Sequence, residues 1–177
     1  MEKRLEVPKK IGVIAGGFDP IHEGHVDFIK DSTSKYSLDK VFILIEKKSL
    51  HKKIFAPYED RKKMVQLAIS DDKKISIYET DFDNFPISNC LPKIKIQYPK
   101  SKIHLLIGSD VAEHIHNWEG SDELLEDVEL IISQRQQGHE KRFFKSGEAR
   151  AKVNEPGRPA ELSDKVFEYI KNNKLYL

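Results

Sequence analysis

The stretch AGGFDPIHEGH, residues 15–25, decides the fold and follows a short apolar run. Within eleven residues it holds three glycines, one proline and two histidines. The proline biases the aspartate before it towards extended backbone, so a helix cannot run straight out of the preceding strand. We therefore expect the chain to turn at Gly16 and Gly17 and to begin a helix near Gly24. We call residues 15–25 the Gly-His segment.

Outward from this segment, apolar runs alternate with segments of helical spacing. The runs are short, β-branched and nearly unbroken, as in strands that are covered on both faces, and they occupy residues 11–15, 41–45, 75–78, 103–107 and 128–133. Helical spacing appears at residues 25–35, 58–69 and 121–126. This alternation predicts an α/β fold, a Rossmann-like doubly wound parallel sheet of about five strands with helices on both faces.

Three further segments complete the outline of what we interpret as a single domain, residues 1–177. Pro86 and Pro92 interrupt residues 85–98, where the pattern could otherwise be helical. Residues 134–160 are polar and predict a long loop that contains at most a short helix. Residues 162–175 predict a packed C-terminal helix with Ser163 as its N-cap.

The amino-acid composition limits the possible binding partners and the cellular compartment. The net charge is +1, from 30 basic and 29 acidic side chains, so we expect no nucleic-acid partner. Cys90 is the only cysteine, which excludes an intramolecular disulfide and favours the cytoplasm. The apolar runs fall far short of the roughly 20 residues that cross a bilayer, so we expect no membrane partner. The sequence is compatible with a homo-oligomer.

The Gly-His segment also predicts a phosphate site. A helix that begins there presents unpaired N–H groups at the carboxyl edge of the first strand, where open α/β sheets bind ligands. Gly16, Gly17 and Gly24 let the backbone approach a ligand. His22 and His25, three residues apart, can donate N–H groups to oxygens that gain charge during a reaction. We therefore expect phosphoryl chemistry with these two histidines as the catalytic residues.

A zinc site is the alternative for the two histidines. It would need a third ligand, for which His114 and His116 are available. No cysteine pair and no H-E-x-x-H helix accompanies them, so we predict no resident metal.

Residues 17–25 resemble the signature G-[S/T]-F-D-P-[I/F]-H-x-G-H of the nucleotidyltransferase superfamily, with Gly17 where a hydroxyl residue is usual. The chain is most similar to bacterial nicotinate mononucleotide adenylyltransferases. The resemblance continues in residues 61–64 (RKKM), in residues 108–110 (GSD) followed by Trp118, and in residues 166–176 near the C-terminus. Arg61 is expected to anchor its helix rather than to touch a ligand.

The resemblance implies transfer of AMP from ATP to the phosphate of nicotinate or nicotinamide mononucleotide, with release of pyrophosphate, in NAD biosynthesis. Mg²⁺ would be bound through the ATP phosphates. On the ATP side the resemblance implies a set of glycines, one aromatic residue and several polar or charged residues, which are Gly16, Gly17, Phe18, Gly24, Asp110, Arg135, Ser146 and Arg150. On the acceptor side it implies His51, Lys52 and Trp118.

Each residue carried over in this way has a plainer alternative. Asp110 could cap the helix that follows it, and Trp118 could pack in the core or on the surface. Arg135 and Arg150 lie in a stretch rich in basic residues and could be solvated charges. The His51–Lys52 pair could belong to an exposed loop.

Two departures from the family pattern leave other functions open. The family's S-Y-T element, which helps to recognise the nicotinate end, is replaced by FPI at residues 85–87. The late S-[S/T]-x-x-[I/V]-R element is reduced to Ser146 and Arg150. The alternatives are therefore an adenylyl- or cytidylyltransferase with another acceptor, such as phosphopantetheine or a sugar or polyol phosphate, and a nucleotide-binding module without catalysis.

Overall fold

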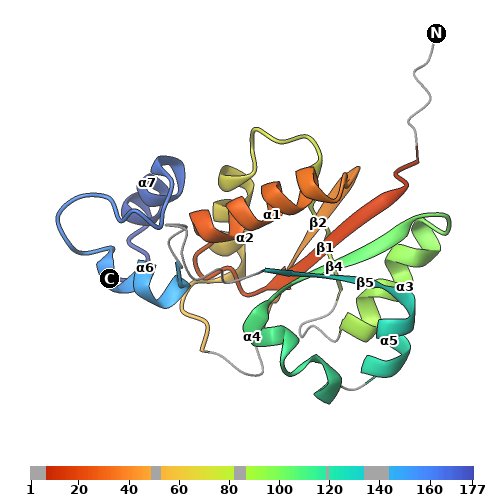
Figure 1. The fold of residues 1–177 in the computed structure, drawn as a ribbon. Coiled ribbons are helices and arrows are strands. Elements are labelled where there is room, and N and C mark those ends of the chain that lie inside the picture. The colour runs from red at the N-terminus through yellow and green to blue at the C-terminus, as the bar shows by residue number, and fades with distance from the viewer. Residues whose placement is uncertain (1–6, 49–52, 82–86, 119, 134–143) are drawn as a thin grey trace, which may run out of the picture.

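The computed structural model describes residues 7–48, 53–81, 87–118, 120–133 and 144–177. Within these residues one sheet of five parallel strands has the order β3-β2-β1-β4-β5 (Figure 1). The strands are β1 Lys10–Gly16, β2 Lys40–Ile45, β3 Ile75–Ile77, β4 Lys102–Gly108 and β5 Glu129–Ser133. The predicted doubly wound parallel sheet is confirmed.

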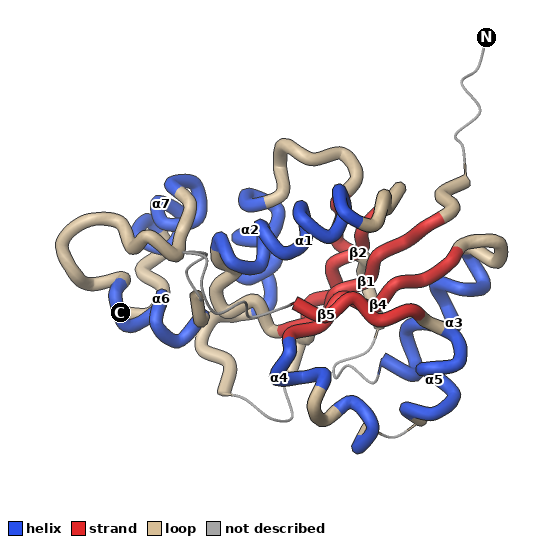
Figure 2. Tube along the Cα trace, in the orientation of Figure 1, coloured by secondary structure: helices blue, strands red, loops and turns tan. Residues whose placement is uncertain are grey.

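Helices cover both faces of the sheet (Figure 2). One face carries α1 Glu23–Lys35 and α2 Tyr58–Ala68, and α7 Asp164–Asn172 packs against α2 in the same apolar cluster. The other face carries α3 Ile87–Gln97 and α5 Ser121–Asp127, together with the short α4 Ser109–Ala112 and the 3₁₀ turn η1 Ile115–Asn117. The remaining helix among the described residues, α6 Ser146–Lys152, packs through Ala149 into the first layer.

Alternation of side chains between the two layers explains the unbroken apolar runs. In β2, Val41 and Ile43 pack into the layer of α1 and α2, whereas Phe42 and Leu44 pack into the layer of α3 and α5. A strand that is covered on both faces needs an apolar residue at every position.

The helix α3 differs from the sequence expectation, which left residues 85–98 undecided. Pro92 lies inside it and cannot donate the backbone hydrogen bond to the preceding turn. Pro92 itself is exposed, while Cys90, Leu91 and Ile94 are buried against the sheet. Tertiary burial therefore outweighs the local cost of the proline.

The C-terminal helix is confirmed, and the Val166 N–H donates to the Ser163 hydroxyl at 3.4 Å, as expected of an N-cap. The predicted 134–160 loop contains the short helix α6, and residues 134–143 lie outside the described part. Among the residues described, no helix has the length and apolar character that crossing a membrane requires. The interpretation of residues 1–177 as one domain stays a prediction.

Candidate active site

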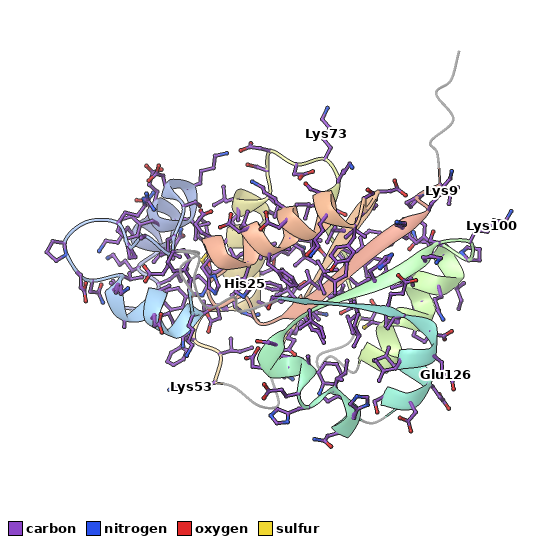
Figure 3. The ribbon with its side chains drawn as sticks, in the orientation of Figure 1. Lys9, His25, Lys53, Lys73, Lys100 and Glu126 are labelled. Carbon is purple, nitrogen blue, oxygen red and sulfur yellow. The ribbon has the colours of Figure 1, made fainter. Side chains whose placement is uncertain are left out.

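The Gly-His segment joins β1 to α1 at the carboxyl edge of the sheet. β1 is paired with β2 on one side and with β4 on the other. The strands that follow in the sequence therefore extend the sheet first on one side of β1, with β2 and β3, and then on the other side, with β4 and β5. This is the switch point at which open α/β sheets bind ligands. The helix begins at Glu23 with His22 as its N-cap residue, close to the predicted start. Figure 3 places His25 at this end of α1.

The turn is made differently from our expectation. The left-handed backbone conformation falls on Phe18, with φ of 46°, and not on Gly16 or Gly17. A Cβ added to Gly17 would meet no other atom within 4 Å, so the space beside its backbone is open. A Cβ on Gly24 would come within 3.2 Å of His22 Nδ1 and 3.5 Å of Phe144 Cβ. Gly24 therefore makes room for the side chains of His22 and Phe144, and its expected role beside a ligand stays a prediction.

The two histidine rings lie against each other. Their centroids are 3.6 Å apart with an interplanar angle of 21°, and Phe18 meets the His25 ring edge-on at 5.1 Å. The His22 backbone N–H donates to His25 Nδ1 at 3.3 Å. Because this nitrogen accepts a hydrogen bond, the neutral His25 ring carries its proton on Nε2. His25 is thus set as an Nε2–H donor.

Burial determines the charge of His22. Its side chain is 7% exposed, and desolvation lowers its pKa to about 4, although the Glu161 carboxylate acts in the opposite direction. His22 is therefore neutral at pH 7. The site holds a ring that can take part in hydrogen bonding without bringing a permanent charge into the interior.

Asp19 was not among the expected site residues, yet it has the densest set of contacts in the segment. It is 6% exposed, and its carboxylate accepts from the backbone N–H groups of Phe55 at 2.7 Å and Ala56 at 3.1 Å. The Tyr176 hydroxyl donates to the same carboxylate at 2.7 Å. Arg150 donates to the Asp19 carbonyl and stands 3.8 Å from the carboxylate. The sequence around Asp19 gives no indication of partners so far away along the chain.

Arg61 holds the loops that surround the segment. Its side chain is fully buried, and burial lowers the pKa of its guanidinium. It donates to the carbonyl oxygens of Gly17, Glu46, Lys47 and Ala56 at 2.6 to 3.1 Å. Arg61 therefore ties the loops after β1 and β2 to the start of α2, which is more than the expected anchoring of its own helix.

The late segment, residues 144–150, packs on the Gly-His segment. Phe144 meets the His22 ring edge-on at 6.4 Å. The Ser146 hydroxyl donates to the Pro20 carbonyl at 2.9 Å, and the Arg150 guanidinium lies 4.2 Å from the centroid of the Phe55 ring. The structure thus brings Ser146 and Arg150 to the same loop as the two histidines.

The other expected residues are more dispersed. Asp110 lies in the first turn of α4, directly after β4, and is exposed. Trp118 follows η1 and is half-buried against the α3 and α5 layer, so packing accounts for part of its surface. His51, Lys52 and Arg135 lie outside the described residues.

The zinc alternative finds no support in the geometry. Within the described ranges, no three or more His, Cys, Asp or Glu side chains are grouped so that they could hold a metal ion. His114 and His116, the possible third ligands, belong to those ranges.

Comparison with known proteins gives a family match over most of the chain. A family model described as Cytidylyltransferase-like matches residues 13–173. A "Probable nicotinate-nucleotide adenylyltransferase" of Borrelia hermsii is 29% identical, covering 95% of this chain and 98% of that protein. A protein of Neisseria meningitidis serogroup C with the same name is 30% identical, covering 72% of this chain and 67% of its own length.

Solved structures share the fold at lower identity. Plasmodium falciparum nicotinic acid mononucleotide adenylyltransferase complexed with NaAD has a TM-score of 0.80 at 17% identity, covering 95% of this chain and 97% of that one. A putative nicotinate-nucleotide adenylyltransferase from Vibrio parahaemolyticus has a TM-score of 0.75 at 22% identity, covering 93% and 99%. The sheet and its helices are therefore arranged as in these proteins.

Proposed function

Because the chain belongs to the cytidylyltransferase-like family, we propose that it transfers AMP from ATP to nicotinate mononucleotide in the synthesis of NAD. The observation that carries this proposal is the stacked pair of histidines at the start of α1, beside the open space at Gly17. The names of the relatives indicate the acceptor. We place the activity in the cytoplasm.

The reaction needs positioning and charge stabilisation more than acid–base chemistry. A phosphate oxygen of the acceptor attacks the α-phosphorus of ATP, the bond to the β-phosphate oxygen breaks, and pyrophosphate leaves. The attacking phosphate is already anionic at neutral pH, so no general base is required and no covalent intermediate with the protein is expected. Catalysis then depends on holding the phosphates in line and stabilising the charge that develops.

His25 is the donor for that charge. Its Nδ1 accepts from the His22 backbone N–H, so the proton is on Nε2, and in this proposal Nε2–H donates to the α-phosphate or to the bridging oxygen. His22 is neutral and stacked on it, and fixes the orientation of the ring. The Glu23 N–H at the start of α1 donates to the Glu161 carbonyl at 2.8 Å and the His25 N–H to the His22 carbonyl at 2.9 Å, so the expectation of unpaired N–H groups does not hold for these two. The dipole of α1 still favours phosphate at this end.

Basic and aromatic residues complete the site in this proposal. Ser146 and Arg150 contact the triphosphate, and Arg150 would exchange its contact with the Asp19 carbonyl for a phosphate oxygen. Asp110 holds a ribose hydroxyl, and Trp118 stacks on the base of the acceptor, a contact typically worth about 0.5–1.5 kcal/mol. Arg135 contributes to the ATP side, and His51 and Lys52 to the acceptor side.

Mg²⁺ enters as part of the substrate, bound to the ATP phosphates. It neutralises phosphate charge and helps to orient the leaving pyrophosphate.

A panel of acceptors tests the proposed reaction. Pyrophosphate release is measured with ATP or CTP, each paired with nicotinate mononucleotide, nicotinamide mononucleotide, phosphopantetheine and a sugar or polyol phosphate. We expect ATP with nicotinate mononucleotide to give the highest kcat/KM. A higher value with another acceptor would assign the chain to the alternative that the residues Phe85, Pro86 and Ile87 favour. Tight ATP binding with no pyrophosphate from any acceptor would indicate a binding module.

Replacement of His25 tests its role in the reaction. We expect His25→Ala to lower kcat about 10²-fold or more, which is typical for loss of one donor to the transition state. The exposed His114, which lies outside the Gly-His segment, supplies the control variant His114→Ala. Equal turnover of the two variants would contradict the role of His25.

A further inference from the structure

We propose that Tyr176, the penultimate residue, is a positioning residue of the nucleotide site and acts through Asp19 on Arg150. The inference rests on the proposed function, because it assigns the ATP phosphates as the partner of Arg150. It concerns a hydroxyl that is 157 residues away from its acceptor in the sequence.

The contacts of the Asp19 carboxylate carry the argument. Oδ1 accepts from the Tyr176 hydroxyl at 2.7 Å and from the Ala56 N–H at 3.1 Å. Oδ2 accepts from the Phe55 N–H at 2.7 Å and faces the Arg150 guanidinium at 3.8 Å. One buried carboxylate therefore joins the Gly-His segment to the 55–56 turn, to α6 and to the C-terminus.

Tyr176 is a fixed donor in this arrangement. Burial raises the pKa of its hydroxyl, and the hydrogen bond to Asp19 raises it further, so the phenol stays protonated. Its proton is directed to a charged acceptor, which makes the bond stronger than one between neutral groups.

The end of α7 is built to bring this hydroxyl to Asp19. Lys174 and Tyr176 have φ of 52° and 63°, the left-handed conformation that non-glycine residues seldom adopt. The Leu175 N–H donates to the Ile170 carbonyl at 3.0 Å and closes the helix end. Asn154 donates to the Tyr176 carbonyl at 3.4 Å. The C-terminal residues are thus held in a defined path, and the strained backbone is retained where it aims a side chain at the site.

The donors on Asp19 determine how firmly this residue holds Arg150. Each N–H or O–H group that donates to the carboxylate stabilises its negative charge and weakens the attraction between the carboxylate and the guanidinium. The same guanidinium lies on the Phe55 ring, and Phe55 also donates its N–H to Asp19. Removal of the Tyr176 hydroxyl leaves the charge with fewer donors, so Arg150 is held more tightly by Asp19 and exchanges less readily to a phosphate.

The experiment compares Tyr176→Phe with Tyr169→Phe. Tyr169 lies on α7 and donates its hydroxyl to the Asp60 carboxylate at 2.8 Å, so its variant loses a similar bond that ties α7 to α2 and not to Asp19. Steady-state kinetics give KM for ATP, KM for the acceptor and kcat, and calorimetry gives the Kd for ATP without turnover. Thermal unfolding shows whether both variants are folded.

We expect Tyr176→Phe to raise KM and Kd for ATP about tenfold, the size of one hydrogen bond to a charged group. The KM for the acceptor should stay unchanged, and Tyr169→Phe should keep both ATP constants. A double-mutant cycle with Arg150→Lys should show that the combined loss is smaller than the product of the single losses, because both changes act on the same contact.

Equal ATP constants in the two tyrosine variants would overturn the inference, and so would losses that multiply in the cycle. If the wild-type protein binds ATP but transfers AMP to no acceptor, the proposed function fails while the Kd comparison still decides the role of Tyr176. If the wild-type protein does not bind ATP, both fail.

Discussion

His22 shows how one residue can serve a charged ligand from a buried position. Its ring stacks on His25 and is covered by Phe144, and its neutral form follows from desolvation. A lysine in the same place would bring a permanent charge and a larger desolvation cost. The neutral ring therefore suits a helix start whose dipole favours an anion.

The lowered pKa of His22 makes stability depend on pH. Between pH 6.5 and pH 4 the unfolded chain binds a proton at this residue and the folded chain does not, so the free energy of unfolding falls as pH falls. The shift from 6.5 to about 4 corresponds to about 3 kcal/mol. Urea unfolding of the wild type and His22→Gln from pH 7 to pH 4 should show a smaller pH dependence in the variant. Parallel curves for the two proteins would contradict the buried neutral ring.

Replacement of Arg61 should lower the stability of the fold rather than weaken ligand binding specifically. Arg61→Met leaves the buried carbonyl of Ala56 and the partly buried carbonyls of Gly17, Glu46 and Lys47 without this donor, and we expect a loss of about 3 kcal/mol or more in the free energy of unfolding. Lys102→Met, at the exposed ion pair with Glu129, is the control and should lose about 1 kcal/mol or less. Similar losses of unfolding free energy for the two variants, measured in urea, would contradict the role of Arg61 in holding the loops together.

At the scale of elements, the strands and most helices followed from local pattern. A run such as VFILI, residues 41–45, admits one interpretation because it supplies apolar side chains to both faces of a sheet. The helix α3 could not be predicted, because the cost of Pro92 is local and visible whereas the burial of Cys90 and Ile94 is tertiary. The turn after β1 was expected at glycine, but the left-handed residue is Phe18, whose ring reaches His25.

A substitution in the connection from β1 to α1 should separate an effect on ligand binding from an effect on folding. We expect Gly17→Leu to keep the free energy of unfolding within about 1 kcal/mol, because the φ of Gly17 is not left-handed and no atom lies within 4 Å of the new Cβ. A leucine side chain is larger than the hydroxyl residue usual at this position in the family and extends into the space proposed for the phosphates, so KM for ATP should rise. Urea unfolding and steady-state kinetics measure the two effects.

Gly157→Ala provides the opposite pattern as a control. Its φ of 91° opposes a side chain, so stability should fall by about 1 kcal/mol or more while KM for ATP is unchanged. If Gly17→Leu leaves KM for ATP unaltered, the open space at Gly17 is not a ligand site.

In the whole molecule, distant segments meet at one edge of the sheet. The edge itself could be predicted, since parallel strands end together and the glycines and histidines follow the first of them. The contacts that organise it could not, because Asp19 meets Phe55, Arg150 and Tyr176 from 36, 131 and 157 residues away. The periodic pattern of a local stretch of sequence does not indicate which distant residues will make contact. The chain therefore specifies the place of the site locally and its support through tertiary contacts.

The most direct test of the central claim is a long-range ¹H–¹⁵N spectrum of the histidine rings, recorded with and without MgATP and without acceptor. In the absence of nucleotide, His25 should show the tautomer with the proton on Nε2, and His22 should be neutral at pH 7. MgATP should shift the resonances of both rings and leave those of His104, buried within β4, unchanged. If ATP binds while the rings of His22 and His25 keep their resonances, the nucleotide does not lie at the start of α1 and the account is contradicted.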